Sequence, residues 1–152
     1  MMPTISATAT FKINPNTSGL LARVGTGLFD GVSAGAKLIE DAAIQRCPVD
    51  TGALVSSIST SVTRGIQSAT AGGPISSSIF AVQGIVAPHE PYAAYVEYGT
   101  GRRGASSAGA GKGPYSENWP GMVAQPYMRP ALDENRDAVV ETVRESVKSA
   151  LG

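Results

Sequence analysis

The stretch Cys47-Pro48-Val49-Asp50-Thr51-Gly52-Ala53-Leu54 separates two different sequence patterns. Before it, over residues 18–47, apolar residues recur at intervals of three, four and seven, which predicts a long helix that the proline ends. After it, over residues 54–64, apolar and hydroxyl residues alternate, which predicts a strand. Residues 49–53 are predicted to form the turn between them, because the glycine can take positive φ.

Glycines are frequent in the predicted first helix, at Gly25, Gly27, Gly31 and Gly35. Each weakens a helix by up to about 1 kcal/mol relative to alanine. The helix therefore needs support from the rest of the fold, and its small residues permit another backbone to approach closely.

Further along the chain, residues 65–78 are rich in Gly, Ser and Ala and predict a hairpin loop. A second strand is predicted over residues 78–87, with Gly84 marking a bulge. Residues 92–98 predict a short helix that Gly99 ends.

The remaining pattern completes the expected domain. Residues 126–130 predict a short extended piece, and Pro130 suits the first turn of a last helix that runs to about residue 151. The fold class is therefore α+β: a small antiparallel sheet packed by two long helices, one N-terminal and one C-terminal. Residues 1–18 are expected to be a mobile or strand-like arm, and residues 19–152 a single domain that contains residues 99–121 as a flexible Gly/Ser-rich loop.

Composition excludes several classes of protein. Lys and Arg number 12 and Asp and Glu number 12, so the formal net charge is zero, whereas a protein that mainly grips phosphate carries a clear basic excess. Cys47 is the single cysteine, so no intrachain disulfide is available and a reducing compartment such as bacterial cytoplasm is expected. No signal peptide or membrane span is visible. The sequence supports no metal site and no cofactor.

Three motifs allow an enzymatic interpretation. Asp50-Thr51-Gly52 is typical of the loop of a dimeric aspartic protease, but here it follows a helix end and a proline rather than a strand, so a turn is the favoured interpretation. Residues 109–113 resemble a phosphate-binding loop but lack two of its required residues. His89 is the only histidine and has no nucleophile elbow beside it.

Glu97 and Arg129 each lie within a motif of apolar and aromatic residues. We expect either a charge-assisted contact between them, within a subunit or between subunits, or two solvated surface charges. The surrounding aromatic residues suit either an interface or an ordinary core: Tyr92, Tyr95, Tyr98, Trp119 and Tyr127.

Three motifs occur in a fixed order: Val49-Asp-Thr-Gly-Ala-Leu54, then Tyr92-Ala-Ala-Tyr-Val-Glu-Tyr-Gly-Thr100, then Gln125-Pro-Tyr-Met-Arg-Pro-Ala-Leu132. Together they resemble the HK97 gp10-like family of siphophage neck and tail-completion (minor tail) proteins, over about residues 20–150. The chain departs from that pattern at Val55-Ser56, where a basic residue is usual, and in its longer loop at residues 99–121.

The resemblance implies a virion structural protein and not an enzyme. It implies a ring of identical subunits, expected to be a hexamer, that joins the tail to the DNA-filled head and lines the DNA channel. The neighbours would be a head-closure or adaptor protein and a tail terminator or tail tube protein. A tail terminator or head-closure ring is the nearest alternative, and a dimeric aspartic protease using Asp50 is a more distant one. Assembly in the host cytoplasm would place the protein in the virion neck.

Candidate interface residues come from the three motifs and the loop. Two interpretations of the loop stay open, because its Arg102, Arg103 and Lys112 suit either contact with DNA in the channel or docking between rings. The expected subunit or partner contacts are Asp50, Thr51, Gly52, Tyr92, Tyr95, Glu97, Tyr98, Gly99, Arg102, Arg103, Tyr127 and Arg129.

Overall fold

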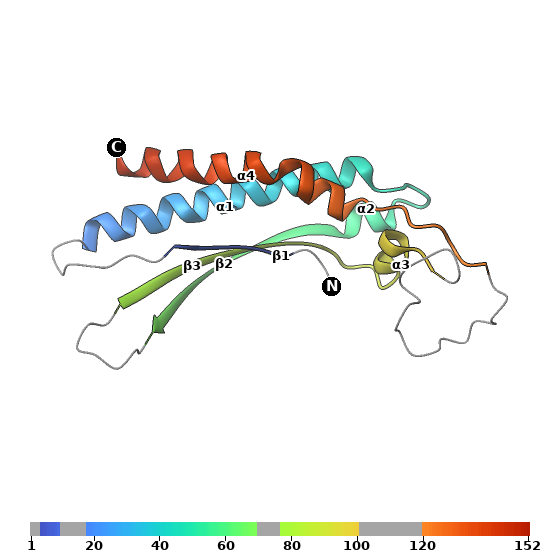
Figure 1. The fold of residues 1–152 in the computed structure, drawn as a ribbon, viewed down its shortest axis with the longest axis horizontal. Helices are drawn as coiled ribbons and strands as arrows, with labels where there is room; N and C mark the ends of the chain where they lie inside the picture. Colours follow the sequence, from blue (N-terminus) through green and yellow to red (C-terminus); the bar gives the residue numbers. More distant parts are fainter. Residues whose placement is uncertain (1–3, 10–17, 70–76, 101–119) are drawn as a thin grey trace. The chain divides into compact units, whose positions relative to one another are not determined.

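The computed structural model describes residues 4–9, 18–69, 77–100 and 120–152 (Figure 1). The fold class is α+β, with an antiparallel sheet and long N- and C-terminal helices, as the sequence predicts. The elements in chain order are β1 (Thr4–Ala9), α1 (Ser18–Arg46), α2 (Ala53–Ser57), β2 (Ile58–Ala69), β3 (Ser77–Pro88), α3 (Ala93–Tyr98) and α4 (Met128–Leu151).

The residues group into two compact units, and α1, β2, β3 and α4 each contribute to both. The first unit comprises Met1–Leu38, Thr60–Val86 and Asn135–Gly152. The second unit comprises Ile39–Ser59 and Ala87–Glu134. All three sequence motifs lie in the second unit.

The core of the first unit joins both long helices to the sheet. Val24, Leu28 and Val32 of α1 are buried with Val82 of β3. Four partly buried apolar residues pack against this cluster from α1, β2 and α4: Phe29, Val62, Val143 and Val147. The apolar periodicity of α1 therefore identified the helix face that meets the sheet.

In the first unit α1 and α4 run side by side, and three glycines one turn apart on α1 form the contact. A Cβ atom added at Gly31 would lie 2.7 Å from Val143 Cα. One at Gly27 would lie 2.9 Å from Ala150 Cβ, and one at Gly35 2.7 Å from Val139 Cγ1. The predicted close approach of another backbone is confirmed, and α4 makes it.

The sheet has three strands in the order β1-β3-β2. The register of β1 against β3 runs one for one from Thr4↔Ile85 to Ala9↔Phe80, antiparallel. The pairing with β1 shows no bulge at Gly84, which lies directly opposite Ile5. The glycine instead admits α1, because a Cβ there would lie 3.0 Å from Val32 Cγ1.

The strand predicted from Leu54 begins later, because residues 53–57 form the short helix α2. Gly52 precedes it with φ 82°, and the Ser56 N–H donates to the Gly52 O at 3.0 Å. The Ser57 hydroxyl donates to the Leu54 O at 2.8 Å. Serine hydroxyls that bond back to the chain stabilise this helical turn, although the alternating pattern favoured a strand.

Two other predicted boundaries also change. The strands β2 and β3 extend further into the predicted hairpin loop than expected. Residues 126–130 do not form a strand, because α4 already begins at Met128. The predicted loop at residues 99–121 lies mostly outside the described residues. Within the described part of the chain, no helix combines the length and apolar character that a membrane span requires.

Candidate functional site

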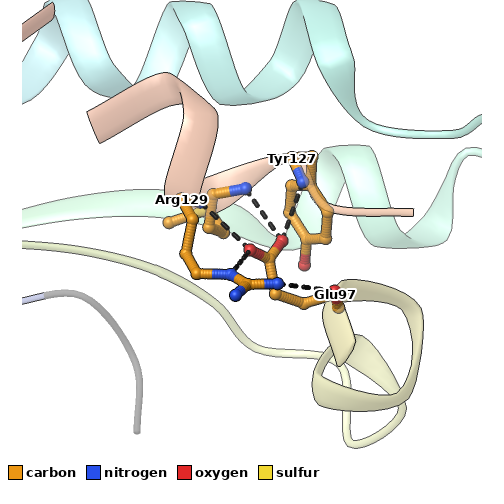
Figure 2. A network of polar contacts seen from close by, with 4 residues as sticks. Glu97, Tyr127 and Arg129 are labelled. Carbon is orange, nitrogen blue, oxygen red and sulfur yellow. Dashed lines mark hydrogen bonds and ion pairs between the residues drawn. The ribbon is translucent and has the colours of Figure 1, made fainter. Parts of the chain in front are cut away.

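The Glu97 carboxylate is the centre of a polar network in the second unit (Figure 2). Its Oε2 accepts hydrogen bonds from the backbone N–H groups of Tyr127, at 2.7 Å, and Met128, at 2.9 Å. Its Oε1 accepts from the backbone N–H of Arg129, at 3.1 Å, and from the Arg129 Nε, at 3.0 Å. Each carboxylate oxygen therefore accepts two hydrogen bonds.

The local sequence places this carboxylate at the start of α4. Glu97 is the penultimate residue of α3, and Gly99 follows that helix with φ 69°. The first N–H groups of any helix lack partners within the helix and carry a partial positive charge. Glu97 supplies the missing acceptor from a distant part of the chain, which explains why α4 begins at Met128 rather than at Pro130.

Arg129 adds a second layer to the network. Its guanidinium donates to the Glu97 backbone O at 3.4 Å and lies 4.7 Å from the centre of the Tyr98 ring. The contact predicted between Glu97 and Arg129 is thus present within one chain. The Arg129 side chain is 50% exposed while that of Glu97 is 6% exposed, so the arginine covers a buried carboxylate.

The pKa of Glu97 reflects two opposed effects. Burial raises the pKa of this carboxyl, but the backbone N–H groups of Met128, Tyr127 and Arg129, with the Arg129 side chain, outweigh burial and leave the pKa below its usual value. The network therefore holds Glu97 as a carboxylate, which is the form that can accept all four hydrogen bonds.

A hollow of about 830 Å³ lies in the same unit. The turn that contains Asp50 forms one wall, and α3 with the residues around Met122 forms the other. The lining residues are Pro48, Val49, Asp50, Thr51, Gly52, Leu54, Tyr92, Tyr95, Val96, Thr100, Met122 and Gln125. The first two motifs and the start of the third thus border one concave surface.

The walls of the hollow are held by backbone hydrogen bonds. The Thr100 N–H donates to the Met122 O at 2.9 Å, and the Met122 N–H donates back to the Thr100 hydroxyl at 3.1 Å. The Gln125 N–H donates to the Val96 O at 2.8 Å. These bonds hold residues 122–125 beside α3. No pattern in the sequence predicts them.

Much of the rim of the hollow is apolar and open. Val49 is 73% exposed, Tyr95 44%, Tyr92 38% and Met122 36%. Leu54, by contrast, is buried. Large exposed apolar side chains gathered around a concavity are typical of a surface that contacts another protein.

Tyr127 is buried beside this network, and its Oη has no hydrogen-bond partner among the described residues. Burial, followed by the charges of Cys47, Glu97 and Tyr92, raises the pKa of the Tyr127 phenol well above its usual value. Burial likewise raises the pKa of the Cys47 thiol. Both groups therefore stay protonated and act as packing residues.

His89 makes a different contact, with Ser59. The Ser59 hydroxyl and the His89 Nε2 lie 2.8 Å apart, and the His89 N–H donates to the Ser57 O at 3.2 Å. Both side chains are exposed, and neither lines the hollow. Over residues 4–9, 18–69, 77–100 and 120–152, no three metal-ligating side chains gather at one point.

The predicted interface residues divide into three groups. Asp50, Thr51, Gly52, Tyr92 and Tyr95 line the hollow. Glu97, Tyr98, Tyr127 and Arg129 form the adjacent network, and Gly99 ends α3. Arg102 and Arg103 lie outside the described residues.

Sequence reasoning missed Thr100, Met122 and Gln125 as parts of the hollow. Thr100 and Gln125 belong to the second and third motifs, whereas Met122 belongs to none, and pairing between residues more than twenty positions apart brings the three together. The apolar character of Met122 next to Val123 was the available signal.

Comparison with known proteins gives no assignment: no protein-family model, no curated protein and no solved structure matches this chain.

Proposed function

We propose that this chain is a structural subunit of a bacteriophage neck, a tail-completion ring protein that joins the tail to the DNA-filled head. In this proposal copies of the chain form the ring, expected to be a hexamer, between a head-closure protein and the tail terminator or tail tube. The ring encloses the DNA channel, and the subunit performs no chemistry. A terminator or head-closure ring is the alternative within the same class.

The observation that carries the proposal is the meeting of the three motifs in one unit. Glu97 of the second motif binds the backbone of the third, and the hollow is bordered by the first and second. These three motifs are the ones that carry the resemblance to neck proteins. Their convergence on one apolar, partly exposed surface supports a role in protein contact.

The setting of Asp50 favours this role over that of a protease. The residue is exposed on a turn between α1 and α2, at the rim of the hollow. A dimeric aspartic protease instead carries its aspartate on a loop that follows a strand, where the pairing of strands positions the carboxylate, whereas Asp50 follows the helix α1 and Pro48.

The test is a phage assembly experiment. The phage genome that encodes the chain is given an early stop codon in this reading frame, and lysates are examined by negative-stain electron microscopy. Separate DNA-filled heads and tails are expected, and supplying the intact chain in trans should restore joined particles. Normal joined virions without the protein would overturn the proposal.

An Asp50→Asn variant supplied in trans separates the ring from the protease. Restored joining, together with no peptide cleavage by either the variant or the parent protein, supports the ring. Cleavage by the parent protein that disappears in the variant would support the enzyme.

A further inference from the structure

The formal net charge of the chain is zero, but its charged residues are divided unevenly between the two units. By sequence, the second unit contains eight acidic and five basic residues, and the first unit contains four acidic and seven basic residues. Opposite charge on two surfaces of one molecule favours contact between one copy and the next, because like surfaces repel and unlike surfaces attract.

The hollow lies in the acidic second unit, and Asp50 is the charged residue among those that line it. Asp50 lines it and makes no ion pair with any described residue. The two basic residues described in the second unit are already engaged, Arg129 with Glu97 and Arg46 with Glu134. An occupant of the hollow must therefore bring its own positive charge to Asp50, and apolar surface to Val49, Tyr92 and Tyr95.

One exposed stripe of the first unit has this chemistry. Arg136, Val140 and Arg144 are each one turn apart on α4, and all three are exposed. Val140 is among the most exposed large apolar residues described, at 52%. The stripe spans about 12 Å, at 1.5 Å per residue, and presents an apolar side chain between two guanidinium groups, of which that of Arg144 pairs with Glu141 on the same helix.

We propose that the hollow of one copy receives the Arg136–Val140–Arg144 stripe of a second copy. Val140 enters between Tyr92 and Tyr95, whose rings also offer their faces to the arginines, and the Arg136 guanidinium pairs with Asp50. The hollow and the stripe use different residues, so the contact is head-to-tail and each copy keeps one free hollow and one free stripe. Such contacts close into rings or continue as filaments.

This inference rests on the proposed function only for its biological setting, since it names the surfaces through which copies would form the ring. Its test uses purified full-length protein and two charge reversals. Asp50→Arg reverses the charge at the hollow and leaves the stripe unchanged. Arg136→Glu reverses a charge of the stripe and leaves the hollow unchanged. Masses are measured by light scattering and analytical ultracentrifugation, at low and high salt.

The parent protein should self-associate, and more weakly at high salt. Each variant alone should associate roughly tenfold less tightly or worse. The two variants mixed should associate again, because the intact hollow of Arg136→Glu meets the intact stripe of Asp50→Arg, and the two reversed charges also attract each other. Arg23→Glu, a reversal elsewhere in the basic unit, is the matched control and should associate like the parent.

Three outcomes would overturn the inference: a parent protein that stays monomeric, variants that associate like the parent, or a mixture that associates no better than either variant alone. Dimers of Arg136→Glu alone that form as readily as those of the parent protein would indicate an isologous contact. That result also overturns the inference. These results are independent of phage assembly, so the neck function can fail while head-to-tail association holds, and the reverse is equally observable.

Discussion

Replacing Glu97 by glutamine tests whether the carboxylate network holds the start of α4. Glutamine has nearly the same shape, so the substitution leaves no cavity and changes only charge and hydrogen bonding. Each carboxylate oxygen accepts two hydrogen bonds. Whichever oxygen becomes an NH₂ group, two donors lose their acceptor and face another donor.

The expected cost follows from these two lost bonds. A hydrogen bond to a charged group contributes about 1.5–3 kcal/mol, so two of them correspond to about 3 kcal/mol at the lower limit. Little is added for the ion pair itself, because the Arg129 side chain is 50% exposed and well screened. We therefore expect Glu97→Gln to lower the free energy of unfolding by about 3 kcal/mol, a large share of the roughly 5–15 kcal/mol typical of a domain.

The assay is equilibrium unfolding in urea, followed by circular dichroism at neutral pH. The matched control is Glu141→Gln, which removes a carboxylate that pairs with Arg144 three residues later on the exposed surface of α4. That pair should contribute less than about 0.5 kcal/mol. A cost below about 1 kcal/mol for Glu97→Gln, or equal costs for the two variants, would refute the reasoning.

The same pair of proteins makes a pH prediction. The hydrogen bonds to Glu97 hold its folded-state pKa below the usual range of a glutamate, so the stabilisation from this carboxylate is complete above the unfolded-state pKa and is lost as pH falls through the folded-state pKa. The difference in unfolding free energy between the parent protein and Glu97→Gln should therefore stay constant above about pH 5 and shrink toward acid. A difference that grows as pH falls would contradict the assignment.

Four further substitutions probe packing and buried polar groups, each by urea unfolding. Gly31→Ala should destabilise the protein by about 1–3 kcal/mol, because the new Cβ meets the Val143 backbone. Gly25→Ala has open space around it and should stabilise the protein by up to about 1 kcal/mol. Equal effects of the two substitutions would show that the helix contact is looser than described. Tyr127→Phe should leave stability unchanged or raise it by up to about 1 kcal/mol, since the lost hydroxyl has no partner among the described residues, and a loss of more than about 1 kcal/mol would reveal one. Thr100→Val should cost about 1 kcal/mol by leaving a backbone N–H without its hydroxyl acceptor, and an unchanged midpoint would show that water replaces it.

The elements most accurately predicted from the sequence are those with long periodic patterns. The apolar spacing of α1 and α4 identified both helices and the faces that they bury. The glycines of α1 predicted a close helix contact, but not that Val143 of α4 would make it. Backbone approach between distant segments depends on tertiary packing, which local patterns do not encode.

Short elements were harder to predict, because tertiary and local hydrogen bonds decide them. The serines after Leu54 suited an alternating strand equally well, yet their hydroxyls bond back to the chain and form α2. The start of α4 depends on Glu97, some thirty residues earlier. For the site, the sequence drew attention to Glu97 and Arg129 as unusual charges, but the hollow needed Met122, which only the folded backbone brings into place.

The paired backbone of Thr100 and Met122 has a practical consequence for locating the protein. Two hydrogen bonds, at 2.9 and 3.1 Å, join these two residues and hold the ends of the intervening segment together. Residues inserted between them are therefore not expected to displace α3 or α4. Lengthening a connection whose ends are already fixed costs little, about 0.6 kcal/mol for each doubling. An epitope tag inserted there offers a way to label the subunit in intact particles with antibody and to identify its copies by eye.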